Sequence, residues 1–145
     1  MKSFKLVIAL ALSMFLLVAC GSPSDMKASV LSAGSLLGTP NEVNQILTGG
    51  GISNLQIIDV RTPAEFATGC LSPAKNIDLK SPDFVERISS LDKNASYLVY
   101  CRSGGRSAEA AAQMKEAGFN NIIELKGGII NWETEGYSLS QNCVL

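Results

Sequence analysis

The 145-residue sequence contains no histidine, which removes Ser-His-Asp and Cys-His catalysis and most zinc and iron sites. It also lacks internal repeats, low-complexity tracts and any cluster of positive charge, and its formal net charge is −1. We therefore expect no nucleic-acid partner. Any chemistry must use Cys, Arg, Asp, Glu, Ser, Thr, Tyr or Lys side chains.

Cysteine is scarce and widely spaced, at Cys20, Cys70, Cys101 and Cys143. No two of these residues have the C-x-x-C spacing that is typical of tetrahedral metal sites. We therefore expect neither a metal nor any other cofactor. Each cysteine needs its own explanation.

The amino terminus has the layout of a secretory signal, because Lys2 and Lys5 precede an apolar run that ends at Cys20. The run is shorter than the roughly 20 apolar residues that span a bilayer. Its L-V-A-C ending resembles the bacterial lipobox, in which the cysteine becomes the first mature residue and carries the lipid. We expect a signal peptide over residues 1–19, lipidation of Cys20, and an exported lipoprotein at a cell membrane or facing the periplasm. The alternative is an ordinary signal peptide that is cut nearby and releases a soluble protein.

Residues 20–37 are rich in Gly, Ser and Ala and have no periodic apolar face, which predicts a flexible tether. Over residues 38–145, turn signals alternate with short apolar runs, which predicts one α/β domain with a largely parallel sheet. We expect strands at 55–60, 76–77, 97–100 and 122–125. We expect helices that open at Pro40, Pro63 and Ser81, a helix over 108–117, and a last helix that carries Trp132.

The chemistry is concentrated where Cys101 follows an apolar strand and precedes a glycine-containing loop and a helix. Gly104 and Gly105 can adopt positive φ, so that successive backbone N–H groups converge on one point. The start of the helix adds about half a positive charge. With Arg102 and Arg106 nearby, we expect the pKa of Cys101 to lie below the ordinary thiol value of about 8.5. The same loop would bind an anionic substrate.

The loop C-R-S-G-G-R-S closely resembles the active loop of rhodaneses. Further matching motifs are I-I-D-V-R at 57–61, P-A-E-F-A-T-G at 63–69, A-K-N-I-D at 74–78 and G-G-I-I-N-W at 127–132. The resemblance covers about residues 39–136. It implies a rhodanese-like three-layer α/β fold, in which a five-stranded, mostly parallel sheet is flanked by helices and the active cysteine follows the central strand.

The resemblance also implies the reaction. A rhodanese loop of six residues, C-x4-R, handles sulfane sulfur, whereas the related phosphatases and arsenate reductases use C-x5-R for a larger oxyanion. Cys101 would take sulfur from thiosulfate or a persulfide donor, become a persulfide, and pass the sulfur to a thiol or cyanide. The resemblance thus implies an enzyme of the thiosulfate sulfurtransferase type. The alternative is a persulfide carrier without turnover that serves a protein acceptor.

We expect substrate binding from the loop residues Arg102, Ser103, Gly104, Gly105, Arg106 and Ser107. Arg106 could clamp the anion or merely pair with Glu65 or Asp59, and these roles are compatible. Arg102 could steer the substrate or be a solvated charge. We expect three further residues to hold the loop in position without touching substrate: Asp59, Arg61 and Glu65.

The sequence departs from the rhodanese G-H-x-x-G-A motif at Cys70, which replaces the histidine. We expect Cys70 and Cys143 to form a disulfide, which would persist in an oxidising compartment. Each follows a helix that should run back from the carboxyl ends of the strands, which predicts that both lie on the face opposite the active loop. The alternative is two unrelated thiols.

Overall fold

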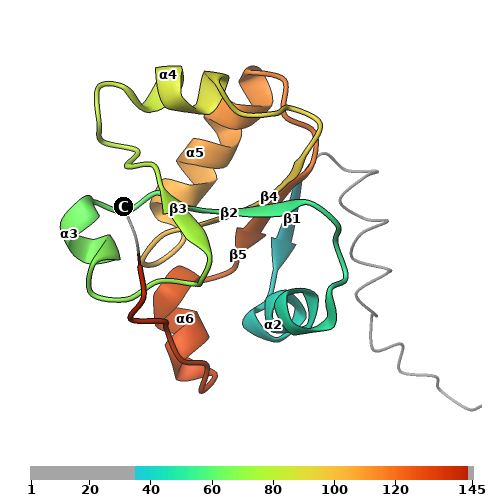
Figure 1. Cartoon of the computed structure of the whole chain (residues 1–145), viewed down its shortest axis with the longest axis vertical. Coiled ribbons are helices and arrows are strands. Elements are labelled where there is room, and N and C mark those ends of the chain that lie inside the picture. Colours follow the sequence, from blue (N-terminus) through green and yellow to red (C-terminus); the bar gives the residue numbers. More distant parts are fainter. Residues whose placement is uncertain (1–34, 144–145) are drawn as a thin grey trace, which may run out of the picture.

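The computed structural model describes residues 35–143 (Figure 1). The predicted signal peptide 1–19, the lipidation site Cys20 and residues 20–34 of the predicted tether lie outside the described residues. No helix within 35–143 is long and apolar enough to cross a membrane.

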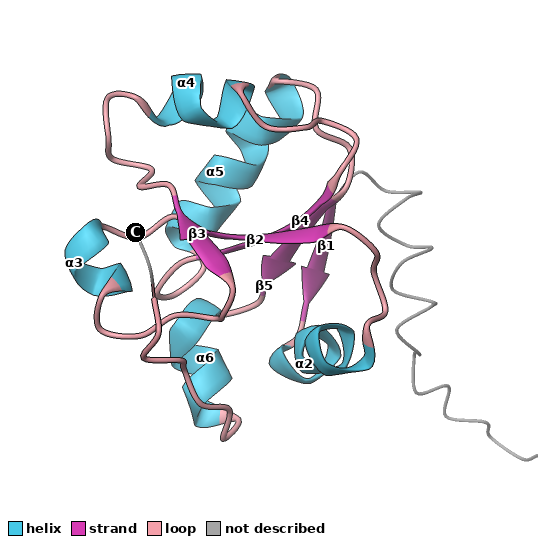
Figure 2. Cartoon of the chain, viewed as in Figure 1, coloured by secondary structure: helices cyan, strands magenta, loops and turns pink. Residues whose placement is uncertain are grey.

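A five-stranded sheet forms the centre of the molecule (Figure 2). Its order is β1-β5-β4-β2-β3, and every pair of neighbouring strands is parallel. This confirms the expected α/β fold with β4 as the central strand. The strands are β1 (Ser35–Gly38), β2 (Leu55–Asp59), β3 (Ala74–Asn76), β4 (Ser96–Tyr100) and β5 (Ile122–Leu125).

Strand β1 corrects the predicted boundary of the tether. Residues 35–37 were expected to belong to the tether, but they are part of β1. This strand pairs with β5, from Ser35 opposite Ile122 to Gly38 opposite Leu125. The sequence pattern missed this strand because it is short and lies at the sheet edge. Leu36 packs on the core, whereas the neighbouring Leu37 is 55% exposed.

Helices cover both faces of the sheet, with α4 and α5 on one face, α2 and α6 on the other, and α3 beside the β3 edge (Figure 1). Their bounds are α2 (Pro40–Gly49), α3 (Pro63–Phe66), α4 (Phe84–Ser89), α5 (Gly105–Glu116) and α6 (Gly128–Thr134). The capping boxes at Thr39 and Thr62 start α2 and α3 where the sequence predicted. Helix α4 starts later than expected, because Ser81 forms a turn with Phe84 before it.

The central strand β4 is buried on both faces, and this explains its continuous apolar sequence. Tyr97 and Val99 belong to the core under α4 and α5. Leu98 and Tyr100 belong to the core under α2 and α6. The residue that follows this rigid strand, Cys101, therefore has a well-defined position.

Candidate active site

Cys101 directly follows β4 and is only 1% exposed. Helix α5 begins four residues later, at Gly105, three residues before the expected start. Gly104 caps the helix in a left-handed conformation, with φ of 103°. This conformation, which glycine adopts without strain, lets the Gly104 N–H donate to Cys101 Sγ at 3.1 Å. The loop thus wraps around the sulfur, as expected from its glycines.

The surroundings of Cys101 favour its thiolate. Burial by itself would raise the pKa of this thiol, but hydrogen bonds outweigh burial and lower the pKa below its ordinary value. The hydrogen bond from the Ser107 side chain is the largest of these, followed by the N–H groups of Ser107, Gly104 and Ser103. The direction of the shift agrees with the sequence expectation, but the loop and Ser107 produce it rather than mainly the arginines.

Ser107 can serve both protonation states of the sulfur. Its buried hydroxyl lies 3.6 Å from Cys101 Sγ and donates to the Gly104 carbonyl oxygen at 3.0 Å. A thiol can donate to this hydroxyl while the hydroxyl donates to Gly104. A thiolate can instead accept the hydroxyl proton. Ser107 was expected only as one of several loop residues, because the sequence does not show which hydroxyl faces the sulfur.

Arg106 pairs with Glu65, one of the two partners that the sequence left open. Its two terminal nitrogens donate to the two carboxylate oxygens of Glu65, both at 2.7 Å. Glu65 also accepts from the N–H and hydroxyl of Thr62 at the start of α3. The ion pair therefore fastens the end of the loop to α3.

Arg102 and Ser103 are exposed, and Gly105 is the exposed first residue of α5. Within residues 35–143, the Arg102 guanidinium has no hydrogen bond or ion pair with another group. Arg102 is thus a cation beside Cys101 whose charge is available to an anion.

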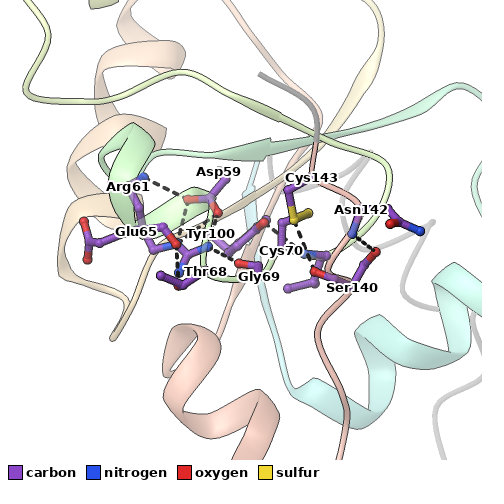
Figure 3. Close-up of a disulfide and its surroundings, with 11 residues drawn as sticks. Asp59, Arg61, Glu65, Thr68, Gly69, Cys70, Tyr100, Ser140, Asn142 and Cys143 are labelled. Carbon is purple, nitrogen blue, oxygen red and sulfur yellow. Dashed lines mark hydrogen bonds and ion pairs between the residues drawn. A yellow bond between two sulfur atoms is a disulfide. The ribbon is translucent and has the colours of Figure 1, made fainter.

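Asp59 and Arg61 form a buried ion pair at the end of β2, with Nη2 and Oδ2 2.7 Å apart. Arg61 Nη2 also donates to the Gly69 carbonyl oxygen at 2.6 Å (Figure 3). Their hydrogen bonds in the described residues go to one another and to segments outside the active loop. Their link to the loop runs through Tyr100, which pairs with Asp59 and has the Arg61 guanidinium 6.0 Å from its ring centre.

The Gly127–Gly128 turn packs against the active loop, a role that the sequence analysis did not identify. A Cβ atom at Gly128 would lie 2.5 Å from the Cys101 carbonyl oxygen. The N–H of Ile129 donates to that oxygen, and the N–H of Ile130 donates to the carbonyl oxygen of Arg102. The G-G-I-I motif is the only sequence signal, because the contact joins residues far apart in the chain.

A pocket of about 350 Å³ borders the loop at Arg102. Polar, charged and apolar residues line it: Arg61, Glu65, Thr68, Arg102, Glu133, Ile129, Ile130 and Leu139. The sequence analysis had not associated Leu139 or Glu133 with the site.

Cys70 and Cys143 are joined by a disulfide, with their Cα atoms 6.0 Å apart (Figure 3). The sequence argument placed the pair opposite the active loop. The structure instead places the neighbouring segments near it, since Leu139 lines the pocket and the Leu71 N–H donates to the Tyr100 hydroxyl. The reason is that α3 has only four residues, and at 1.5 Å per residue it is too short to carry the chain across the sheet.

Several relatives of known name are sulfurtransferases. The chain is 36% identical over 80 residues to a protein named sulfurtransferase from Allochromatium vinosum, covering 55% of this chain and 73% of that protein. It is 34% identical over 96 residues to thiosulfate sulfurtransferase GlpE of Pseudomonas aeruginosa, covering 66% and 81% of the two chains. It is also similar to the probable adenylyltransferase/sulfurtransferase MoeZ of Mycobacterium tuberculosis, but spans only 28% of that length.

Solved structures have the same fold. A rhodanese-related protein from Thermoplasma volcanium superposes with a TM-score of 0.64 at 26% identity, covering 74% of this chain and 99% of the other. A rhodanese-like domain protein from Staphylococcus aureus gives a TM-score of 0.60 at 29% identity, covering 73% and 97%. The model of the rhodanese-like domain matches residues 39–135. This match supports sulfurtransferase activity in general, and the chain belongs to the rhodanese-like domain family.

Proposed function

We propose that the protein moves sulfane sulfur from thiosulfate or a persulfide donor to a thiol or cyanide through a persulfide on Cys101. The single observation that carries this proposal is the Cys101 sulfur itself. It is buried at the end of the central strand and accepts a hydrogen bond from the Gly104 N–H, within a six-residue loop. Such a loop stabilises negative charge on sulfur without any histidine.

In the first step, the Cys101 thiolate attacks the outer sulfur of thiosulfate. A new S–S bond forms, the original S–S bond breaks, and its electron pair leaves with sulfite. In the second step, an acceptor thiolate attacks the outer sulfur of the Cys101 persulfide and leaves with it, which restores the Cys101 thiolate. Neither step needs a general base at the moment of attack, because both nucleophiles are anions.

Arg102 is the cation we assign to the incoming anion. Arg106 is held by Glu65 in a bidentate pair, so its two terminal nitrogens are already engaged. Arg102 is exposed next to Cys101 and borders the pocket. It would attract a dianion such as thiosulfate to the mouth of the loop.

The second candidate is a carrier that receives sulfur on Cys101 and delivers it only to a docked protein. The exposure of Ile130 favours the carrier, because this apolar side chain is 49% exposed beside the pocket, where a docked protein could cover it. Thiosulfate and cyanide together distinguish the two. Rapid repeated formation of thiocyanate supports the enzyme. A Cys101 persulfide that forms once and persists in the presence of cyanide and small thiols supports the carrier.

We also propose that the protein is an exported lipoprotein held at a membrane through Cys20. The Cys70–Cys143 disulfide supports this proposal, since such bonds persist in oxidising compartments. Metabolic labelling of producing bacteria with a radioactive fatty acid tests it. Label should enter the wild type and the Cys143→Ser variant but not Cys20→Ser, and label in Cys20→Ser would exclude this lipidation site.

A further inference from the structure

Residues 137–143, called here the C-terminal segment, lie beyond residues 39–135 of the family match. Three sets of contacts hold this segment in place, and Figure 3 shows those that Cys143 and Ser140 make with Cys70. Cys143 is disulfide-bonded to Cys70, and Ser140 exchanges two backbone hydrogen bonds with Cys70 at 2.9 and 3.0 Å. Trp132 donates from its ring N–H to the Ser138 carbonyl oxygen and packs against Tyr137.

These contacts place Leu139 at the pocket beside the active loop. Leu139 is half-buried and packs closely on Gly69. A Cβ atom added at Gly69 would lie 3.1 Å from the Cβ atom of Leu139. The close approach is possible because residue 69 is a glycine, whose φ of 143° is also one that L side chains rarely adopt. The Gly69 carbonyl oxygen is itself held by Arg61. Leu139 is therefore held in place by the contacts of the C-terminal segment and by Gly69, which Arg61 holds in turn.

The pocket combines an apolar wall with a cation. Ile129, Ile130 and Leu139 supply the apolar surface, and Arg102 supplies a positive charge that no acidic group of the described residues neutralises in an ion pair. Arg61 is neutralised by Asp59. Glu65 and Glu133 also line the pocket, and Glu65 is neutralised by Arg106. A volume of about 350 Å³ is at the lower end for small-molecule sites.

We propose that Leu139 is a specificity-determining residue for the sulfur acceptor, and that the pocket selects a thiol with an apolar chain and one carboxylate. This inference rests on the proposed function. The carboxylate pairs with Arg102, and the apolar chain packs between Leu139 and Ile130. The pocket borders Arg102, the neighbour of Cys101, and Ile129 donates to the Cys101 carbonyl oxygen. The acceptor is thereby held beside Arg102, which directly follows the residue that carries the sulfur.

The step that this pocket serves is the second half of the reaction. The acceptor thiolate forms a bond to the outer sulfur of the Cys101 persulfide, while the bond between the two persulfide sulfurs breaks and returns its electron pair to Cys101. The acceptor leaves as a persulfide. No external oxidant or reductant is consumed.

The experiment measures the second step alone. Full-length protein is loaded with thiosulfate, the loaded fraction is determined by intact mass, and sulfur transfer is then followed to mercaptohexanoate, mercaptopropionate or mercaptohexanol. These aliphatic thiols have similar intrinsic reactivity and differ in chain length and charge. Wild type should prefer mercaptohexanoate over both others. Leu139→Ala should reduce the preference for mercaptohexanoate over mercaptopropionate by about tenfold, the lower end of the range for a small change in a hydrophobic site.

Val85→Ala is the matched control, because Val85 is a 60% exposed aliphatic residue on α4, across the sheet from the pocket. Its acceptor preference should equal that of wild type. A Cys70→Ser/Cys143→Ser double variant loosens the segment by removing its disulfide, leaves Leu139 unchanged and should also weaken the preference. If circular dichroism shows that Leu139→Ala does not fold, the double variant tests the role of Leu139 instead.

The outcomes separate this inference from the proposed function. A wild-type protein that takes no sulfur from thiosulfate contradicts the proposed function. If wild type loads and transfers sulfur, but the Leu139→Ala and double serine variants keep its preference for mercaptohexanoate, the role of Leu139 is wrong. Loss of preference in these variants and its retention in Val85→Ala support the inference.

Discussion

Glu65 accepts one hydrogen bond from each terminal nitrogen of Arg106, and both N–O distances are 2.7 Å. Glu65 simultaneously closes the capping box of α3 with Thr62, so one carboxylate joins two helix starts. The six-residue active loop is therefore fixed at both ends. Its first residue, Cys101, continues β4, and its last, Arg106, is tied to α3.

This ion pair predicts how stability depends on pH. The hydrogen bond from Arg106 is the main cause that lowers the pKa of Glu65 from its ordinary value of 4.5 to about 2. A lowered folded-state pKa stabilises the protein above pH 4.5, and this stabilisation is lost as the pH falls from 4.5 to about 2. Glu65→Gln, which can still cap α3, should lower stability at neutral pH by on the order of 1 kcal/mol, since both side chains are partly exposed. Urea unfolding at neutral pH and near pH 2 checks this. If the free energies of unfolding of wild type and Glu65→Gln differed by the same amount at both pH values, the prediction would be wrong.

Cys101→Ser should abolish sulfur loading and leave the fold intact, because an oxygen cannot form the persulfide and the change in volume is small. The wild-type chain should gain the mass of one sulfur atom after thiosulfate treatment, at Cys101. Intact mass spectrometry and peptide mapping measure the gain, and thermal unfolding should place the variant within about 1 kcal/mol of wild type. Thiosulfate turnover by the serine variant would refute the mechanism.

Ser107→Ala should raise the pKa of Cys101, because the hydrogen bond from the Ser107 side chain is the largest contribution that lowers it. Less thiolate is then present at any pH below that pKa, so the pH profile of loading should move to higher pH. The rate at acidic pH should fall several-fold. Alkylation of Cys101 by iodoacetamide as a function of pH measures the shift. Ser89→Ala, which removes an exposed hydroxyl on α4, is the control, and an identical profile for both variants would exclude this role of Ser107.

Gly128→Ala should distort the active loop, because the new Cβ atom would meet the Cys101 carbonyl oxygen at 2.5 Å and the φ of 61° is unfavourable for alanine. We expect a loss of at least about 1–3 kcal/mol in stability and a larger fractional loss in sulfur loading. Gly49→Ala serves as control, since a Cβ there has no neighbour within 4 Å. Wild-type loading by Gly128→Ala would show that this packing does not position the loop.

The disulfide predicts a thiol count. In a Cys20→Ser protein isolated without reductant, denaturation should expose one reactive thiol, Cys101, and reduction should raise the number to three. Because the bond joins residues 73 positions apart, reduction should lower stability by about 4 kcal/mol in the chain-entropy model. Three reactive thiols before reduction would exclude the bond.

The local features of the fold could be predicted from the sequence. The sequence predicted helix starts at Pro40 and Pro63, and the apolar runs around Leu98 and Ile123 predicted parallel strands. Gly104 predicted a loop that wraps around Cys101, as the structure has it. These features are predictable because each depends on residues within a few positions of one another.

Contacts between distant parts of the chain were decided by the tertiary structure alone. Glu65 rather than Asp59 holds Arg106, Gly128 packs on the Cys101 backbone, and Leu139 lines the pocket. Each contact depends on how far a short helix carries the chain and on which loops then meet at the carboxyl end of the sheet. Four residues in α3 keep Cys70 and its partner near the active loop instead of at the opposite end, a distance that periodicity and turn signals do not encode.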